Sequence, residues 1–152
     1  MYRLLLPLCF CLLSLPAWAG DDRGLITLRS ENSVPVTLDR FEQAVRAKGM
    51  TVFARVDHAA GAQGVGLSLP PMQVLIFGNP KIGTLLMQSA PTAGIDLPLK
   101  VLAWEDSEGV VWLAYNDPAY LAGRHAITDR AETVAKMQKA LGIFAGKAVS
   151  TE

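Results

Sequence analysis

Two histidines, His58 and His125, are the side chains of this 152-residue chain with the widest range of possible chemistry. With a carboxylate from Asp57, Asp96 or Asp117, they would supply the nitrogen and oxygen donors that Zn²⁺ or Cu²⁺ accepts in proteins. The histidines lie 67 residues apart, however, and no short spacing such as His-x-x-x-His joins them. Two interpretations stay open: a shared metal or catalytic site, or two histidines that each end a strand or helix by hydrogen-bonding to nearby backbone.

A glycine-containing segment, residues 78–84, follows a strongly apolar run and could begin a helix. Backbone N–H groups at such a helix start can bind an anion, and Lys81 would add a positive charge. The segment lacks the Gly-Lys-Ser/Thr ending of a phosphate-binding loop. The alternative is a strand-to-helix turn in which Asn79 caps the helix and Pro80 occupies its first turn.

Polar residues are also predicted at the ends of other strands and helices, where sheet proteins commonly gather binding groups. We expect a small-ligand site where these ends meet, formed by Asp57, His58, Asn79, Asp96, Tyr115, Asn116 and His125. Two of these residues have simpler alternatives. Asp96 could fix the turn that precedes a strand, and Tyr115 could be a core residue.

Motifs for covalent catalysis are absent from the sequence. It has no Gly-x-Ser-x-Gly motif, and no base can be placed beside Ser68, Ser89 or Ser107. Cys9 and Cys11 are the only cysteines, and both lie in an N-terminal segment that we expect to be removed. The sequence therefore favours a protein that binds a ligand or partner over an enzyme.

The N-terminal segment, residues 1–19, has the features of a secretory signal peptide. Arg3 gives a short positive start, and Ala17-Trp18-Ala19 places small residues where a signal peptidase cleaves. The apolar stretch between them is too short to cross a bilayer. We expect cleavage after Ala19, a periplasmic or secreted bacterial protein of residues 20–152, and no membrane span in that remainder.

The composition predicts a globular domain. Apolar residues make up 51% of the chain and charged residues 18%, which excludes an intrinsically disordered chain. The 14 basic and 14 acidic residues cancel, and this balance argues against a nucleic-acid partner, which requires a basic surface. The length fits one domain, which must be stabilised by core burial because no cysteine remains for a disulfide.

Hydrophobic periodicity predicts a single α+β domain with a mostly antiparallel sheet of five strands and three to four helices, in the order β-α-β-β-α-β-β-α. The expected strands cover residues 25–29, 51–57, 72–77, 99–105 and 110–116. The expected helices cover residues 37–48, 79–90, 118–124 and 129–146, and residues 59–66 form a loop or a weak helix. Thr37 is expected to cap the first helix and Gly49 to end it.

The last two strands are predicted to form a hairpin whose turn ends at Gly109. In that register Trp104 lies opposite Trp112, and Leu102 lies opposite Ala114. Both faces of the hairpin are then apolar, so a helix, a second subunit or a ligand must cover each of them. The tryptophans are expected in the core or a dimer interface, with a ligand-stacking pair as the alternative.

Several stretches combine turn residues with polar groups beside apolar runs, and together they resemble the family known as domain of unknown function 302. They are Asp57-His58, residues 78–84, residues 91–98, Trp104-Glu105-Asp106, residues 115–121 and Arg124-His125. The likeness extends over about residues 24–141. The resemblance implies a compact α+β domain of bacteria and archaea that forms homodimers, and it implies no activity.

These observations lead to one leading hypothesis and two alternatives. We expect a non-catalytic periplasmic homodimer that binds a small molecule or a partner protein at the candidate residues above. The first alternative is a metal-dependent protein that uses His58 and His125 to hold Zn²⁺ or Cu²⁺. The second is a purely structural dimerisation module.

Overall fold

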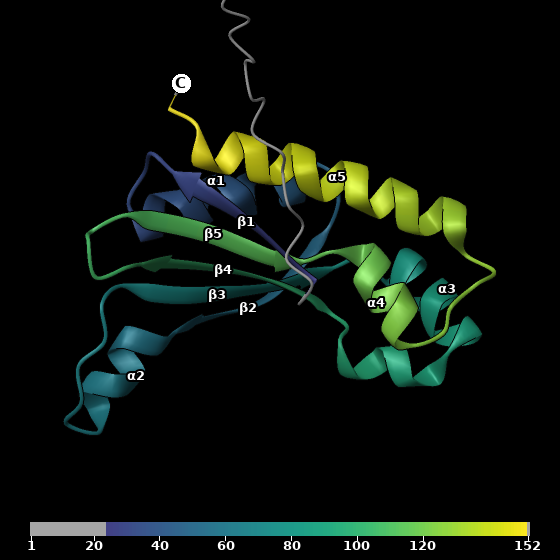
Figure 1. The fold of residues 1–152 in the computed structure, drawn as a ribbon, viewed down its shortest axis with the longest axis horizontal. Helices are drawn as coiled ribbons and strands as arrows, with labels where there is room; N and C mark the ends of the chain where they lie inside the picture. Colours follow the sequence, from purple (N-terminus) through teal and green to yellow (C-terminus); the bar gives the residue numbers. More distant parts are fainter. Residues whose placement is uncertain (1–23, 152) are drawn as a thin grey trace, which may run out of the picture.

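The computed structural model describes residues 24–151, so the predicted signal peptide lies outside the described residues. These residues form an α+β domain around one antiparallel sheet, with strand order β1-β5-β4-β3-β2 (Figure 1). The strands are β1 (Leu25–Ser30), β2 (Thr51–Asp57), β3 (Met72–Gly78), β4 (Leu99–Glu105) and β5 (Val111–Asn116). The helices are α1 (Val34–Arg46), α2 (His58–Gly64), α3 (Pro80–Ser89), α4 (Pro118–Arg124) and α5 (Ala131–Val149), with a 3₁₀ helix η1 (Pro91–Ile95).

The predicted fold class, the five strands and their antiparallel arrangement are confirmed. The described residues form five α-helices, which is more than the three to four predicted. The additional helix is α2, which overlaps residues 59–66, the segment that was predicted to be a loop or a weak helix. This helix contains Gly61 and Gly64 and buries no side chain, so neither helix propensity nor an apolar stripe predicts it.

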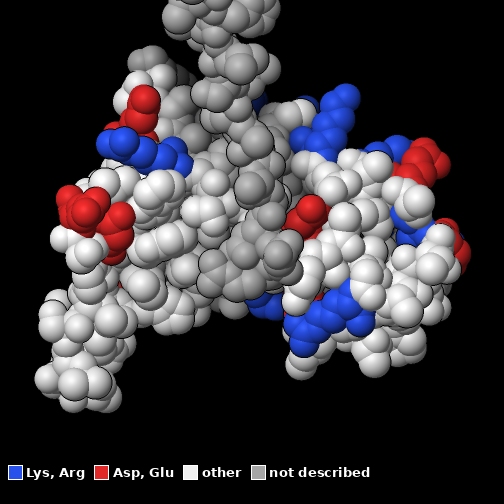
Figure 2. All heavy atoms as spheres, in the orientation of Figure 1, with Lys and Arg blue, Asp and Glu red and all other residues white. Residues whose placement is uncertain are grey.

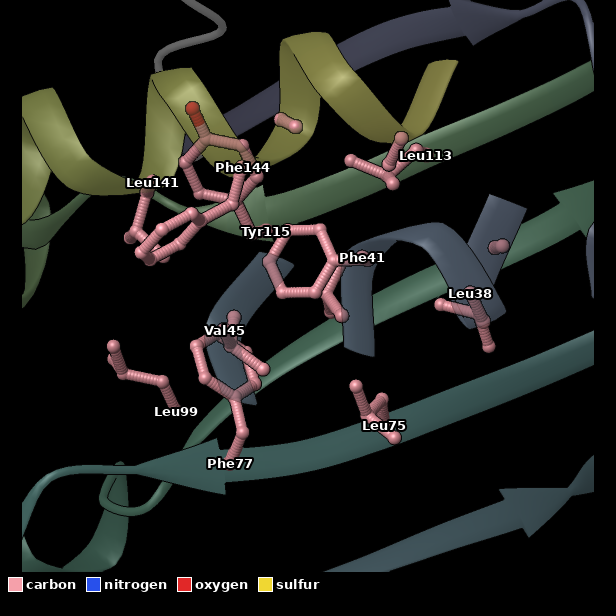
Figure 3. Close-up of a cluster of buried hydrophobic side chains, with 14 of the residues drawn as sticks. Leu38, Phe41, Val45, Leu75, Phe77, Leu99, Leu113, Tyr115, Leu141 and Phe144 are labelled. Carbon is pink, nitrogen blue, oxygen red and sulfur yellow. The ribbon is translucent and has the colours of Figure 1, made fainter. Parts of the chain in front are cut away.

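The main core lies between the sheet and two long helices, α1 and α5. Phe41 of α1 is fully buried, and its ring meets Phe77 of β3 and Phe144 of α5 edge to face, at centroid distances of 5.1 and 6.1 Å. Figure 3 shows these side chains between α1, α5 and the strands, together with Leu75 and Leu113. The two helices therefore cover the same face of the sheet.

Four predicted helix ends, both ends of α1 and both ends of α5, differ from the structure by two or three residues. Helix α1 starts at Val34, so Thr37 is inside it and does not cap it. The fully buried Thr37 hydroxyl instead contacts Ser30 Oγ at 2.7 Å and donates to the Ser33 carbonyl at 2.9 Å. Helix α5 begins at Ala131 without a side-chain cap and extends to Val149, beyond the predicted end. Apolar periodicity locates a helix well but fixes its ends poorly.

The predicted pairing of the β4–β5 hairpin is confirmed. Trp104 pairs with Trp112 and Leu102 pairs with Ala114, while Gly109 has φ +76° in the turn. Asp106 holds this turn because its carboxylate accepts the backbone N–H groups of residues 108 and 110, each at 2.9 Å, and the Trp112 indole N–H at 2.7 Å. These bonds, led by that from Trp112, lower the pKa of Asp106.

We predict that Asp106→Asn weakens the fold at neutral pH and has little effect in strong acid. A carboxylate with a lowered folded-state pKa stabilises the protein above its unfolded value of about 3.9, and this contribution is lost as the pH falls through the folded value. Urea unfolding at pH 7 and near pH 2 measures the difference. Glu108→Gln in the same turn is the control and should change stability little at either pH.

Helix α4 ends in a left-handed turn that an alanine occupies. Ala126 has φ +52°, and the N–H groups of Ala126 and Ile127 bond to the carbonyls of Gly123 and Ala122. This position usually carries glycine, because a Cβ atom strains the left-handed conformation. The fold therefore retains a local strain that one substitution can remove.

We predict that Ala126→Gly stabilises the protein by about 0.5–1 kcal/mol, because it relieves that strain. The same substitution at exposed Ala135, inside α5, should instead destabilise by about 0.5–1 kcal/mol. Thermal and urea unfolding of the two variants measure both effects. Equal signs for the two changes would show that the turn after α4 is not strained.

Candidate functional site

The structure divides the predicted ligand-binding residues between the two ends of the sheet. Asp57 pairs with Gln73 near the start of β3, whereas Asn79 follows the end of the same strand. A strand of this length places its ends about 20 Å apart. Asp96 precedes β4 and Asn116 ends β5, so both lie at the Asn79 end of the sheet, and His125 follows α4 and contacts Asp96 there; Figure 1 shows α3 and α4 at this end.

At the first end, Asp57 has a structural role. Its carboxylate accepts the backbone N–H of Ala60 and the side-chain amide of Gln73, each at 2.9 Å, and so caps α2. The bond from Ala60, with that from Gln73, lowers the pKa of Asp57. His58 follows it and is exposed. These two residues therefore cannot join the others in a single pocket of one chain.

The same separation applies to the predicted metal pair. His58 begins α2 at one end of the sheet, and His125 follows α4 at the other (Figure 1). One ion cannot be bound by both imidazoles of the same chain over such a distance. The structure therefore does not bring the two imidazoles of one chain together, and their predicted pairing rested on residue type without a spacing. Within residues 24–151, no three His, Cys, Asp or Glu side chains are grouped closely enough to hold a metal ion.

At the second end, Asp96 and His125 form a nearly buried pair. Asp96 Oδ2 lies 2.6 Å from His125 Nε2, and Thr92 Oγ1 lies 3.0 Å from His125 Nδ1. The side chains of His125 and Asp96 are only 6% and 14% exposed. Asp96 also accepts a longer bond, 3.3 Å, from Arg124. Both imidazole nitrogens thus have hydrogen-bonding partners. The contacts of His125 with Thr92 and Asp96 link η1 and the residue after it to the end of α4.

The remaining candidates at this end also support local structure. Asn79 caps α3 by accepting the backbone N–H of Lys81 at 2.9 Å, and Pro80 lies in the first turn, as the alternative interpretation predicted. Tyr115 is a core residue, and its burial, with Asp117 nearby, raises the pKa of its phenol. Asn116 ends β5 and pairs with Leu25 of β1.

A cavity of about 520 Å³ lies beside Asn79, between α3, α5 and the adjoining ends of β2, β3 and β4. Its walls are mainly apolar, with Ile82 and Met87 from α3, Leu97 from the segment before β4, and Met137 and Leu141 from α5. Of the predicted site residues, Asn79 alone lines it. The cavity is thus the concave feature to which the strand ends and the two helices all contribute.

Apolar side chains at this cavity are unusually exposed to solvent. Phe53, Met87 and Ile143 are 53%, 37% and 48% exposed, and each lines the cavity. Solvent-exposed apolar groups that gather around a hollow are typical of a ligand-binding or interaction surface. The arrangement can therefore enclose an apolar molecule, which would remove these groups from water.

Sequence reasoning missed these residues because it searched for polar groups. One signal was available on α5, where Val134, Met137, Leu141 and Phe144 form the buried stripe. Ile143 falls outside that stripe, so its apolar side chain has no place in the core. An apolar residue off the buried face of a helix can indicate a second contact surface.

These features define a small α+β domain with a one-sided helical layer and an apolar cavity at one end of its sheet. The chain belongs to the family described as Domain of unknown function DUF302, which residues 26–143 match. The crystal structure of an uncharacterized conserved DUF302 protein from Bacillus stearothermophilus has the same fold, with a TM-score of 0.74. It is 21% identical and covers 82% of this chain and 98% of its own.

Two curated relatives carry the name fluoride-specific ion channel FluC 1. Those of Brucella suis biovar 1 (strain 1330) and Brucella abortus biovar 1 (strain 9-941) are each 54% identical over 106 residues, or 70% of this chain. The match spans only 42% and 39% of their own lengths. Among the helices between residues 24 and 151, none combines the length and hydrophobicity of a membrane span.

Proposed function

We propose that this domain is a non-catalytic binding module that holds a small, largely apolar molecule in the cavity between α3 and α5. The observation that carries the proposal is the cavity itself, whose volume of about 520 Å³ falls within the usual range for small-molecule sites. Its walls offer few polar groups, so burial of apolar surface would supply most of the binding energy.

A cavity-filling substitution tests this proposal. Gly83 of α3 lines the cavity, and a Cβ atom built on it meets its nearest neighbours, Leu97 and Met87, at ordinary contact distances of 3.7 and 4.0 Å. Gly83→Leu should therefore be accommodated while its side chain occupies ligand space. Gly142→Leu is the matched control, because Gly142 lies on α5 with open space around it and does not line the cavity.

The measurement is displacement of a polarity-sensitive dye by dodecanol. We expect the unmodified protein and Gly142→Leu to bind both compounds, and Gly83→Leu to bind them at least tenfold more weakly. Circular dichroism and thermal unfolding establish that both variants are folded. Equal binding by all three proteins would place the apolar site elsewhere on the molecule and overturn the proposal.

The proposed place of action is the bacterial periplasm or the exterior. It rests on the signal-peptide features of residues 1–19, which lie outside the described structure. Expression of the full chain followed by cell fractionation and N-terminal sequencing tests it. The expected product begins at Gly20 in the periplasmic fraction, and an uncleaved product in the cytoplasm would contradict export.

A second candidate function, self-association, is favoured by the sheet face opposite α1 and α5. Side chains on this face remain partly accessible although they are large and apolar; they are Val56, Val74, Ile76, Leu102, Trp104 and Trp112. The adjoining segment of residues 58–71 contains no charged residue and includes Val65 and Leu67, which are 73% and 68% exposed. Figure 2 shows this segment at the lower left, where no acidic or basic residue is coloured.

We propose that a second copy of the chain covers this face. A two-fold axis would let the same apolar surface of each copy contact the other, as is usual in homodimers. Light scattering after size exclusion should give the dimer mass, and Leu102→Arg, in the central strand, should give the monomer. Ala135→Arg, at an exposed position of α5 on the other side of the molecule from this face, is the control. A monomeric unmodified protein at tens of micromolar would reject the dimer.

A further inference from the structure

We infer that the ligand of the α3–α5 cavity is an amphiphile with an anionic head group, such as an alkyl carboxylate, whose head lies against Lys48 and Lys136. This inference rests on the proposed function of the cavity and adds the charge of its ligand. It follows from the distribution of charged and apolar side chains around the cavity.

The charges that line the cavity have one sign. Lys48, in the turn after α1, and Lys136, on α5, are its charged lining residues, and no aspartate or glutamate of residues 24–151 lines it. Two lysines in the lining, with no acid beside them in it, favour an anionic ligand over a cationic one. A neutral apolar ligand would make no ionic contact with either lysine.

The charged groups of the lining are exposed, whereas part of its apolar wall is buried. The Lys136 side chain is 72% exposed, whereas Leu99, Leu141 and Phe144 in the same lining are at most 8% exposed. Lys48 is also exposed, so both ammonium groups lie at the solvent side, next to the exposed apolar rim of the cavity, and the buried part of the apolar wall lies deeper. A lysine in such a place packs its methylene stem along the apolar surface and keeps its charge in water. This is the arrangement that fits a hydrocarbon tail with a charged head.

The ion pair that Lys136 makes does not remove it from this role. Its Nζ lies 2.6 Å from Glu132 Oε1, one helical turn earlier, and the Glu132 side chain is 84% exposed. Exposed pairs of this kind contribute little because both partners stay hydrated. A ligand head group can therefore share or replace Glu132 as the partner of Lys136. Lys48 makes no ion pair within residues 24–151 and stays available for the same head group.

The test compares four probes with the same twelve-carbon tail: dodecanoate, dodecyl phosphate, dodecanol and dodecyltrimethylammonium. Affinities are measured by dye displacement or calorimetry below the micelle concentration, at low and moderate salt. Each exposed lysine contact should tighten anion binding about two- to fivefold, the range for exposed ion pairs. We expect both anions to bind at least about fourfold more tightly than dodecanol, the cation to bind most weakly, and the anion preference to fall with salt. The ratio of the two anions identifies a carboxylate or a phosphate as the preferred head.

Variants assign the preference to the two lysines. Lys48→Gln with Lys136→Gln should reduce dodecanoate affinity at least about fourfold and leave dodecanol affinity within about twofold, since the apolar walls are unchanged. Lys139→Gln with Lys147→Gln is the matched control, because both residues lie on α5 outside the cavity lining. Arginine at positions 48 and 136 should retain the preference.

The outcomes separate this inference from the proposed function. If dodecanol binds as tightly as dodecanoate and Gly83→Leu blocks both, the cavity binds apolar molecules but the inferred head group is wrong. If none of the four probes binds, both the inference and the proposed function fail. Loss of the anion preference in the Lys139 and Lys147 control would also overturn the assignment to Lys48 and Lys136.

Discussion

Replacement of Phe41 by alanine should destabilise this domain by about 3–5 kcal/mol, the range for a fully buried phenylalanine. Phe41 has no exposed surface, and its ring joins α1 to β3 through Phe77 and to α5 through Phe144. Truncation would remove both edge-to-face contacts and leave a cavity where the three elements meet. The loss is a large fraction of the stability of a typical domain.

Urea unfolding measures this loss, and Phe53→Ala provides a matched comparison. Phe53 lies on edge strand β2 and is 53% exposed, so the same truncation removes little buried surface there. We expect the Phe53 variant to change stability by less than about 1 kcal/mol while weakening ligand binding. Similar losses in the two variants would mean that the α1–β3–α5 junction is not the centre of the core.

Replacement of Asp96 by alanine should cost about 1–3 kcal/mol, because it leaves a nearly buried imidazole nitrogen without its partner. His125 is 6% exposed, and its Nε2 lies 2.6 Å from the Asp96 carboxylate. Its other nitrogen is already engaged by Thr92. Asp96→Asn, which keeps a hydrogen-bonding group at the same place, should lose less.

The control is Asp129→Ala, which removes an aspartate that bonds to Ser89 and Arg130 but is 54% exposed. Its effect should be much smaller, since exposed pairs contribute little. Unfolding by urea at pH 7 compares the three variants. Unchanged stability in Asp96→Ala, combined with altered ligand affinity, would show that the Asp96–His125 pair belongs to a binding site instead of supporting the fold.

The sequence was sufficient to predict the fold where a pattern had a strong period or a recognisable turn. The two apolar runs of β4 and β5 and the turn that ends at Gly109 led to the correct hairpin register. Asn79 and Pro80 gave the correct start of α3. Helix α2 could not be predicted firmly because it buries no side chain, so the cap from Asp57 is its main signal in place of an apolar stripe.

The candidate site was harder to predict, for a topological reason. All the polar candidates lie at strand or helix ends, but β3 separates Asp57 and His58 from Asn79, Asp96 and His125. Only the pairing of strands decides which ends meet. The cavity was missed because apolar residues such as Ile143 and Met87 look like core residues in a sequence, and only the packed structure shows that they remain exposed.

Two apolar surfaces compete as the place of ligand binding, the α3–α5 cavity and the open face of the sheet. The most direct test of ligand binding in the α3–α5 cavity is methyl NMR of the protein titrated with dodecanol. We predict that Leu97, Leu141 and the other cavity methyl groups shift and show intermolecular contacts to the ligand tail. Shifts confined to Val74 and Leu102, on the opposite sheet face, would contradict the assignment of the cavity as the binding site.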